Sequence, residues 1–508
     1  MAAEAGAGVP GAAESDAVER GDAAPDPRRW RALAVCVTAL FMTLLDVSIV
    51  NVALPSIGAS TGAATSELQW VVSGYALAFG MVPIIGGRLG DDRGRRQMLL
   101  IGIAGFVVTS TVVGLAPSVG VLIVARVLQG LAGGLVNPQV AGLVQQLFPG
   151  PERGRAFGWI GATVGIATAS GPVLGGAVIS LGGVHLGWRL TFLINVPVGI
   201  TSFVLCRRWL PFVPPSGRHR PLDLTGAALL ALGVLGVLFP AVQYDAAHDA
   251  RLALLLLPAA ALLAGFATWE NGPARRRGHP LVDTALFRIR SYSAGLGLAL
   301  LYFCAYTGLP LVLALFLQDG LGYSALRSGL TASAYAVGSA ISAPVGGWLV
   351  PRLGRRLLVG ALGLFGIGVI GMLVVALTMP GAVPDQRVSL LLVVPLLIAG
   401  FGGGCVITPN QALSLAEVDV RGGSTAGGML QTAQRIGSAV GTAVLGAVFY
   451  AGAAHARGEQ GAARSASYGT AYAVALAVSL VFAAAALCLA VIDARRTRVR
   501  PAPAGPTG

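Results

Sequence analysis

Apolar stretches of similar length alternate with short polar segments from Arg31 to Ile492. Each apolar stretch holds roughly 20 residues, which is the length that an α-helix needs to cross the hydrocarbon core of a bilayer. Fourteen stretches can be counted, at approximately 31–54, 68–87, 97–116, 118–148, 157–181, 189–210, 222–242, 252–269, 293–317, 327–350, 357–378, 387–413, 424–450 and 470–492. The pattern predicts an all-α polytopic membrane protein with 14 transmembrane helices.

Composition supports this class, because 55% of the residues are hydrophobic and only 11% are charged. Residues 1–27 are mostly Ala, Gly, Pro and acidic residues, too polar to bury a core. They lack the basic start and short apolar segment of a secretory signal peptide. We therefore expect a disordered tail over residues 1–30. Arginine-only basic usage and abundant Ala and Gly suggest a GC-rich genome, and hence a bacterial inner membrane.

The formal net charge of +13 comes from 35 arginines and no lysine. If the N-terminus is cytoplasmic, 27 arginines fall in cytoplasmic segments and six on the other side, with Arg126 and Arg435 inside spans. This asymmetry follows the positive-inside rule and predicts that both termini are cytoplasmic. It accounts for the basic charge without a nucleic-acid partner.

An internal duplication is visible in the polar segments. "GGRLGDDRGRR" after the second span aligns without gaps on "GGWLVPRLGRR" after the tenth, 260 residues later. "GGLVNPQ" in the fourth span is echoed by "GGCVITPNQ" in the twelfth, and "ERGRAFG" before the fifth by "DVRGGSTAG" before the thirteenth. Corresponding spans are thus eight apart, whereas two six-helix halves would place them six apart, so two spans are inserted between the halves.

This arrangement predicts five regions. A tail over residues 1–30 precedes an N-terminal six-helix bundle over 31–210. Two inserted transmembrane helices with their linkers occupy 211–290. A C-terminal six-helix bundle follows over 291–492, and residues 493–508 form a second cytoplasmic tail.

Four stretches resemble motifs of the major facilitator superfamily, and specifically of its fourteen-helix drug:proton antiporter family. They are "LDVSIVNVALP" in the first span, "GGRLGDDRGRR" after the second, "RVLQGLAGG" in the fourth and "GATVGIATASGPVLGG" in the fifth. The resemblance covers nearly all of Arg31 to Ile492. It implies two six-helix bundles that rock about a midplane cavity, with the two inserted helices added to that fold.

Asp46 in the first span and Arg126 in the fourth are candidate proton-coupling residues. Inside a span an arginine costs roughly 2.5–3.5 kcal/mol, so it needs a partner. In the resembled fold both spans line the central cavity, which makes Asp46 the first candidate, with Gln129 orienting the arginine. The alternatives are that Arg126 braces a helix junction through backbone carbonyls, and that Asp46 only makes a permanent hydrogen bond, for example with Asn51.

The resemblance also implies gating residues. In "GGRLGDDRGRR" it gives the role of a cytoplasmic latch between the halves to Gly87, Asp91 and Arg95, and Arg96 either joins them or serves only as a positive-inside anchor. The second copy has Pro351 where the first has Asp91, which puts its latch in question. In the fifth span, "GPVLGG" is associated in the family with export, through Gly171, Pro172, Gly175 and Gly176; generic close packing is the alternative. Arg435 in the thirteenth span is either a cytoplasmic gate or a snorkelling side chain.

Substrate contacts are expected from aromatic and polar side chains near the interface of the halves. Tyr302 and Tyr306 lie on one helical face of the ninth span, where their rings suit flat lipophilic compounds and cations; duty in an interfacial aromatic belt is the alternative. Polar handles are expected from Asn51, Gln129, Asn137, Pro138, Asn410 and Gln411.

Together these features predict a proton-coupled efflux antiporter that exports lipophilic, drug-like or antibiotic compounds, cations among them. The alternative is an uptake symporter, or a lipid or metabolite exporter, of the same fold. No Walker-type phosphate loop is present in the sequence, and none of the five cysteines has metal-ligand spacing. We expect no cofactor, no bound metal and no enzymatic activity, and partners limited to substrate, protons and membrane lipid, with the chain acting as a monomer.

Overall fold

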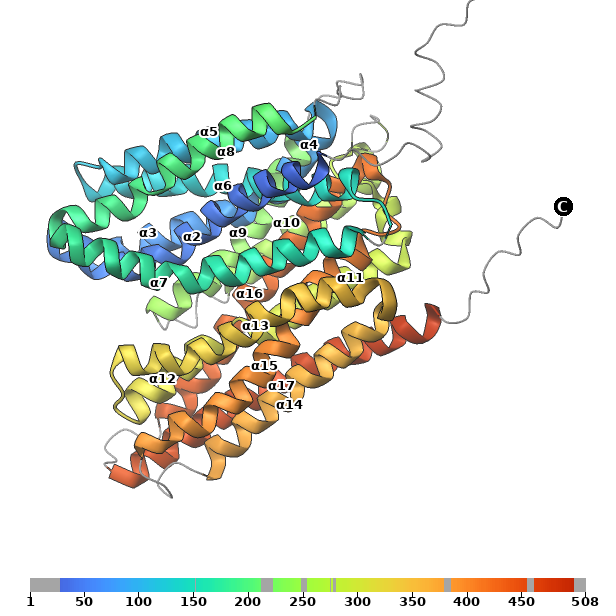
Figure 1. Ribbon diagram of the computed structural model, residues 1–508. Coiled ribbons are helices and arrows are strands. Elements are labelled where there is room, and N and C mark those ends of the chain that lie inside the picture. The colour runs from blue at the N-terminus through green and yellow to red at the C-terminus, as the bar shows by residue number, and fades with distance from the viewer. Residues whose placement is uncertain are drawn as a thin grey trace, which may run out of the picture.

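The computed structural model describes residues 28–150, 152–211, 223–247, 254–274, 276, 280–378, 385–454 and 461–497. These described residues are helical nearly throughout and contain no strand. Figure 1 shows the N-terminal helices, in blue and green, lying beside the C-terminal helices, in yellow to red. The predicted all-α fold is confirmed.

The N-terminal half is built from α2 to α8. Their bounds are α2 (Arg29–Thr61), α3 (Thr65–Met81), α4 (Pro83–Arg93), α5 (Arg95–Gly114), α6 (Val119–Leu147), α7 (Glu152–Leu193) and α8 (Asn195–Trp209). The long α7 reverses direction at Gly183, where φ is +67° and only glycine fits easily. Two antiparallel arms therefore cover the fifth predicted span and the start of the sixth.

The first copy of the duplicated segment, "GGRLGDDRGRR", spans the end of the second predicted span and the polar segment after it. It is helical, because α3 is followed after a 46° bend by α4, which begins with Pro83 and runs to Arg93. The pair Arg88 and Asp92 supports the helix at i,i+4 spacing, with 3.0 Å between Nε and Oδ2. The turn comes only at Gly94, whose φ is +105°.

The inserted helices are α9 (Leu224–Ala247) and α10 (Leu256–Trp269), followed by a short π-helical turn, η2 (Glu270–Ala274). α9 packs on α10, and it also contacts α3 of the N-terminal half and α16 of the C-terminal half. The inserted pair thus covers one side of the contact between the halves.

The C-terminal half runs from α11 to α17. Its elements are η3 (Thr284–Arg288), α11 (Arg290–Tyr306), α12 (Leu309–Leu315), η4 (Phe316–Gly320), α13 (Ala325–Leu353), α14 (Arg355–Thr378), α15 (Asp385–Ser414), η5 (Val420–Gly422), α16 (Gly423–Ala453) and α17 (Gly461–Thr497). The predicted ninth span is broken here into α11, α12 and η4, close to Gly308.

By length and composition, nine helical segments in the described residues can cross a membrane, or ten when the bent pair α3–α4 is included. One of them, Glu152–Trp209, is 58 residues long and contains the reversal at Gly183, and a shorter apolar helix lies at Leu224–Pro240. The chain is a multi-pass membrane protein. The count of 14 spans is consistent with this arrangement, and the five-region division stays a prediction.

The two halves meet through helices α4, α6 and α7 on one side and α13, α15 and α16 on the other. Glycines permit the closest approach: a Cβ atom on Gly87 would lie 2.3 Å from the carbonyl oxygen of Ser424, and one on Gly347 would lie 2.5 Å from that of Gly154. These contacts lie near the end of the bundle that carries Arg95, Arg153 and Arg421, which we call the basic end. The opposite end is called the far end.

Candidate functional site

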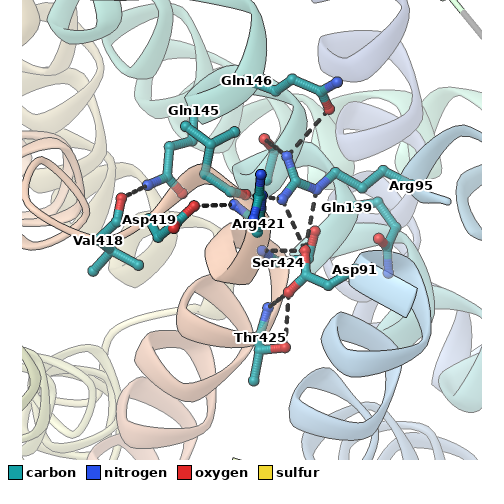
Figure 2. A network of polar contacts seen from close by, with 12 residues as sticks. Asp91, Arg95, Gln139, Gln145, Gln146, Val418, Asp419, Arg421, Ser424 and Thr425 are labelled. Atoms are coloured by element: carbon teal, nitrogen blue, oxygen red, sulfur yellow. Dashed lines mark hydrogen bonds and ion pairs between the residues drawn. The ribbon is translucent and has the colours of Figure 1, made fainter. Parts of the chain in front are cut away.

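A network of hydrogen bonds joins the two halves at the basic end (Figure 2). Its centre is Asp91, in the last turn of α4. Oδ2 of Asp91 accepts hydrogen bonds from the backbone N–H and the hydroxyl of Thr425, both at 2.8 Å, and Oδ1 accepts from the N–H of Ser424 at 3.1 Å. Both N–H groups lie in the first turn of α16, where a carboxylate is favoured by the helix dipole. Asp91 thus caps a helix of the opposite half.

Arg95 holds this carboxylate in place from the same half. Its Nη2 lies 2.8 Å from Oδ1 of Asp91, and its Nη1 donates to the carbonyl of Gly142 at 2.8 Å and to Oε1 of Gln146 at 3.2 Å. Nη2 also donates to the carbonyl of Val420, in the other half. Arg95 is 8% exposed, so these bonds act where water competes little.

Two further side chains of the N-terminal half reach across the basic end. Nε2 of Gln145 donates to the carbonyls of Leu415 and Val418, at 3.0 and 2.7 Å. Arg153 donates weakly to the carbonyls of Leu415 and Ala416, at 3.5 and 3.4 Å. With the Asp91 cap, these contacts join the two halves at the basic end, and we call them the latch.

Arg96 takes no part in this contact between halves. Its Nη2 donates to the carbonyl of Arg207 in α8 at 2.6 Å, inside the N-terminal half. Sequence reasoning identified Gly87, Asp91 and Arg95 at this site. It missed Gln145 and the acceptors on the segment after α15, because backbone carbonyls leave no signal in a sequence.

The second site lies inside the N-terminal half, where α2, α6 and α8 meet. Nη1 of Arg126 lies 2.5 Å from Oδ2 of Asp46, and both side chains are buried, with exposed fractions of 1% and 0%. The contact that we expected between them is present. Nε of Arg126 also donates to the carbonyl of Val71 at 3.0 Å.

Two amides complete the shell of the carboxylate. Oδ1 of Asp46 accepts from Nε2 of Gln129 at 3.1 Å and from Nδ2 of Asn195 at 2.8 Å. Gln129 also accepts from Nη1 of Arg126 at 2.8 Å and donates to the hydroxyl of Ser110 at 2.6 Å. A buried ion pair needs such bonds to offset its lost hydration. Asn195 and Ser110 were missed, since a lone amide and a lone hydroxyl carry no motif.

Aromatic rings connect this ion pair to the other half. The guanidinium of Arg126 lies over the ring of Tyr75, with its carbon 4.2 Å from the centroid. Tyr75 stacks on Phe79, one turn along α3, with the centroids 5.7 Å apart. The guanidinium of Arg435, from α16, lies over the ring of Phe79, with its carbon 4.5 Å from the centroid. Two arginines from opposite halves therefore contact one pair of stacked rings.

A partly open cavity of about 850 Å³ lies between α7 of the N-terminal half and α12, α13 and α15 of the C-terminal half. We call it the central cavity. It reaches from Gly161 and Thr408 to Val173 and Leu326, toward the far end. None of the described residues that line it is charged; their polar side-chain groups are hydroxyls, including those of Tyr306, Tyr335 and Thr408. Such a lining suits an apolar ligand oriented by a few hydrogen bonds.

A cluster of tyrosines forms one wall of this cavity. Tyr306 stacks on Tyr302 and on Tyr335, with centroid distances of 5.7 and 5.3 Å. The hydroxyls of Tyr302 and Tyr335 lie 3.4 Å apart. Tyr306 and Tyr335 line the cavity, whereas Tyr302 is buried behind them. Tyr335 was missed, because nothing in the sequence of α13 places it opposite α11.

The other expected substrate residues lie apart from this cavity. Asn51 is exposed, and Gln129 belongs to the shell around Asp46. Asn137 and Pro138 are buried in α6, and Oδ1 of Asn137 has no hydrogen-bond partner among the described residues. Nδ2 of Asn410 donates to the carbonyl of Gly295 at 2.9 Å, and Gln411 is half-buried beside it. The structure does not gather these six residues at one site.

The glycines of "GPVLGG" pack α7 against α2 within the N-terminal half. A Cβ atom on Gly171 would lie 2.3 Å from the hydroxyl of Ser48, and one on Gly175 would lie 2.8 Å from the side chain of Ile49. Gly176 faces open space. The side chain of Pro172 lies outside the described ones. Close packing is therefore what Gly171 and Gly175 provide in this state.

Comparison with known proteins places these features in a family. The Major Facilitator Superfamily model matches residues 36–442 and, in a second placement, 295–507. The human organic anion transporter MFSD10 has a similar fold, with a TM-score of 0.63 at 16% identity over 90% of this chain and all of that one.

Relatives with higher identity include two proteins of Streptomyces species. A protein described as a probable actinorhodin transporter of Streptomyces coelicolor is 37% identical over 428 residues, covering 84% of this chain and 73% of that protein. The puromycin resistance protein of Streptomyces alboniger is 32% identical over 480 residues, covering 93% of both chains. The family match extends over most of the sequence, and so the chain belongs to the Major Facilitator Superfamily and is a membrane transporter, not an enzyme.

Proposed function

We propose that this transporter exports lipophilic antibiotic-like or drug-like compounds in exchange for protons, from the inner membrane of a bacterium with both termini in the cytoplasm. The family membership and the printed names of the relatives, which include the tetracenomycin C resistance and export protein of Streptomyces glaucescens at 32% identity, support an efflux role. The distribution of arginines supports the orientation. Proton coupling and antiport are the finer part of the proposal.

The proposal depends on the central cavity, whose described lining is uncharged and includes Tyr306 and Tyr335. The latch closes the basic end of the molecule, while the cavity extends toward the far end. About 850 Å³ lies in the upper part of the range of roughly 300–1,000 Å³ that holds drug-sized ligands. With the basic end in the cytoplasm, this state faces outward, and it is the state from which an exporter releases its substrate. Breaking the latch and closing the far end gives the inward-facing state.

Asp46 is the proposed proton site. In this state its charge is matched by Arg126 and its oxygens accept three side-chain hydrogen bonds. A proton that bonds to Oδ2 displaces Nη1 of Arg126, because the neutral carboxyl no longer offers a full charge to the guanidinium. Arg126 then lies over Tyr75 without a matching charge. Tyr75 stacks on Phe79, and Phe79 contacts Arg435 of the other half. Protonation thereby disturbs the contact between the halves.

One proton per cycle supplies enough energy for uphill export. Moving a unit charge through 100 mV is worth about 2.3 kcal/mol. Each 1.4 kcal/mol sustains a tenfold concentration ratio. A membrane potential of 100 mV can therefore sustain a concentration ratio of roughly 40 for each charge moved, and a pH difference would add to it.

The test is efflux of fluorescent dyes and antibiotics from energised cells that express the wild type, Asp46→Asn or Arg126→Ala at matched levels. Asp319→Asn is the control, because it removes an exposed carboxylate outside the ion pair. We expect a protonophore to stop wild-type export, Asp46→Asn to lose uphill transport, and Asp319→Asn to retain it. Uphill pumping by Asp46→Asn would show that another residue couples the proton.

Inside-out vesicles distinguish export from the alternatives. An acidified lumen drives a drug into the lumen only if the transporter is an antiporter. An uptake symporter would instead move its substrate out of the vesicle together with protons. A transporter that moves none of the dyes or antibiotics in either assay would make the lipid or metabolite exporter the better assignment.

A further inference from the structure

A second, smaller cavity lies on the side of the molecule that the inserted helices cover. Its volume is about 340 Å³, and it is bounded by α3, α9 and α16. It differs from the central cavity because one of its walls carries a charged group, the guanidinium of Arg435. We call it the Arg435 pocket; its other lining residues are Gln69, Val72, Ser73, Ala76, Leu77, Leu238, Ser438, Ala439 and Thr442.

The charge of Arg435 is uncompensated in the described part of the chain. No ion pair and no hydrogen bond joins its guanidinium to a described residue, and its one ring contact is with Phe79. The other arginine at this depth, Arg126, has Asp46, Gln129 and a backbone carbonyl as acceptors. Asp46 is committed to that pair, and no described residue that lines the Arg435 pocket is acidic. The pocket is therefore positive, and its open coordination favours an anion.

Two serine hydroxyls belong to the lining of the pocket. The hydroxyl of Ser73 is buried and has no hydrogen-bond partner among the described residues, so its proton is available. Ser438, one turn before Thr442 on α16, lies 3.2 Å from the hydroxyl of Thr307, whose single proton is donated to the carbonyl of Phe303 at 2.6 Å. The remaining walls are apolar, with Leu238 contributed by α9. An oxyanion attached to an apolar body matches both kinds of surface.

The position of Arg435 along α16 indicates whether the oxyanion belongs to a substrate or to a lipid headgroup. Arg435 lies 12 residues beyond Gly423, where α16 begins, and 18 residues before Ala453, where it ends. At 1.5 Å per residue these intervals are about 18 Å and about 27 Å. A phospholipid phosphate stays at the membrane surface, whereas the acid of a lipophilic compound that has entered the protein can reach this depth.

We propose that the Arg435 pocket is a subsite for the carboxylate or phenolate of a lipophilic substrate, with Arg435 pairing directly with the anion. The proposal rests on the proposed export function and adds to it the chemical class of the substrate. The central cavity has no charged side chain in its lining to make such a choice. Arg435 contacts Phe79, and Phe79 stacks on Tyr75, the ring over which Arg126 lies, so these two rings connect the proposed subsite to the ion pair of the proposed proton site.

The experiment compares two fluorescent probes that differ by one charge, 1-pyrenebutyrate and its methyl ester. Each is titrated into the purified full-length transporter in phosphatidylcholine nanodiscs. The variants are Arg435→Gln and, as the matched control, Arg464→Gln, which removes an exposed arginine outside the pocket. Thr442→Leu fills part of the pocket while the charge stays. Thermal unfolding verifies that each variant is folded.

We expect Arg435→Gln to weaken pyrenebutyrate binding by about tenfold or more relative to the ester, the effect of losing one ion pair. Thr442→Leu should weaken pyrenebutyrate binding in the same direction, and Arg464→Gln should leave both affinities unchanged. Equal affinities of the wild type for the two probes, or an unchanged ratio in Arg435→Gln, would overturn the proposal. If Arg435→Gln does not fold, unchanged pyrenebutyrate binding by Thr442→Leu would overturn it instead.

A second set of nanodiscs containing phosphatidylglycerol identifies the source of the anion. Loss of pyrenebutyrate binding in those discs would assign the pocket to lipid and overturn the substrate assignment. Retained binding supports it. Efflux of the neutral methyl ester from energised cells tests export separately, because an uncharged compound does not need Arg435. A transporter can thus fail one test and pass the other.

Discussion

The two copies of the duplicated segment, "GGRLGDDRGRR" and "GGWLVPRLGRR", share three glycines and the final two arginines, but their side chains have different partners. In the first copy Asp91 caps α16 of the opposite half, held by Arg95. In the second copy Pro351 stands in place of that acid, and Arg355 pairs with Asp493 of α17 in its own half. The carboxylate of the first copy therefore contacts the opposite half, whereas the arginine of the second copy pairs within its own half.

One glycine in each copy allows the backbones of the two halves to approach closely. Gly87 lies against the backbone of Ser424 and Thr425, and Gly347 lies against that of Gly154 and Gly158. Both are contacts between the halves that leave no room for a side chain. The duplication therefore preserves close approach on both sides of the interface, whereas the polar latch is built on one side only.

We expect the largest effect from replacing Asp91, because its carboxylate caps α16 of the opposite half and Pro351 of the second copy cannot do so. Asp91→Asn removes the charge from the cap of α16 and leaves the buried guanidinium of Arg95 without its carboxylate, a change that costs about 3–5 kcal/mol for a buried pair. The closed basic end should lose most of its population. The distance between spin labels introduced by Arg93→Cys and Glu417→Cys should increase and broaden in electron resonance measurements, with Cys488→Ser removing the one exposed native thiol among the described cysteines.

An unchanged distance distribution in Asp91→Asn would show that Gln145 and the glycine contacts suffice to hold the basic end. Asp92→Asn is the matched control. Its carboxylate pairs with Arg88 inside α4.

Alanine at Gly87 and at Gly347 tests the part that the copies share. The new Cβ atom would lie 2.3 Å from the carbonyl oxygen of Ser424 in the first case and 2.5 Å from that of Gly154 in the second. Overpacking of this kind costs about 1–3 kcal/mol. We expect both variants to open the basic end to a similar extent, measured with the same labels. Gly360→Ala is the control, because a Cβ atom there meets nothing within 4 Å. A large effect of only one variant would mean that the copies differ in packing as well as in polarity.

Arg355→Gln removes the ion pair made by the second copy of the segment. Its ion pair with Asp493 ties α14 to α17 within the C-terminal half, with exposed fractions of 12% and 17%. We expect the variant to lower the free energy of unfolding by about 1 kcal/mol or less. It should leave the label distance at the basic end unchanged. An opened basic end in Arg355→Gln would show that the second copy also acts as a latch.

The smallest effect is expected at Glu270, just beyond α10 and beside the first copy. Burial, opposed by the N–H groups of Leu281 and Val282 and by the charge of Arg88 and assisted by Asp223, raises the pKa of this carboxyl to about 7. Because the pKa in the folded protein exceeds the ordinary value of 4.5, the stabilisation by the bound proton is complete below pH 4.5 and is lost as the pH rises through about 7.

Glu270→Gln should therefore unfold at a higher temperature than the wild type at pH 8 and should show less decline between pH 5 and pH 8. Its amide oxygen can still accept from Leu281 and Val282. Thermal melts at several pH values measure both quantities, with Glu417→Gln as an exposed control. Parallel pH profiles of wild type and Glu270→Gln would contradict the assignment.

The sequence by itself determined the architecture. Stretches of about 20 apolar residues have few structures open to them in a membrane, because unpaired backbone groups are too costly in lipid and only helices or closed barrels satisfy them. The same reasoning marked Asp46 and Arg126, since a charge inside a span needs a partner. Repeated glycines and arginines likewise marked the segment around Asp91 before any contact was known.

Only the tertiary structure decided which atoms meet. Asn195 lies 149 residues from the carboxylate that it contacts, and Thr425 lies 334 residues from Asp91. Hydrogen bonds of this kind depend on the rotation and depth of each helix, which the apolar pattern leaves free. For the same reason the sequence did not predict that the expected substrate residues lie at separate places, or that Tyr335 and Arg435 line cavities. Composition fixes that a helix crosses the membrane, whereas packing fixes what each of its faces meets.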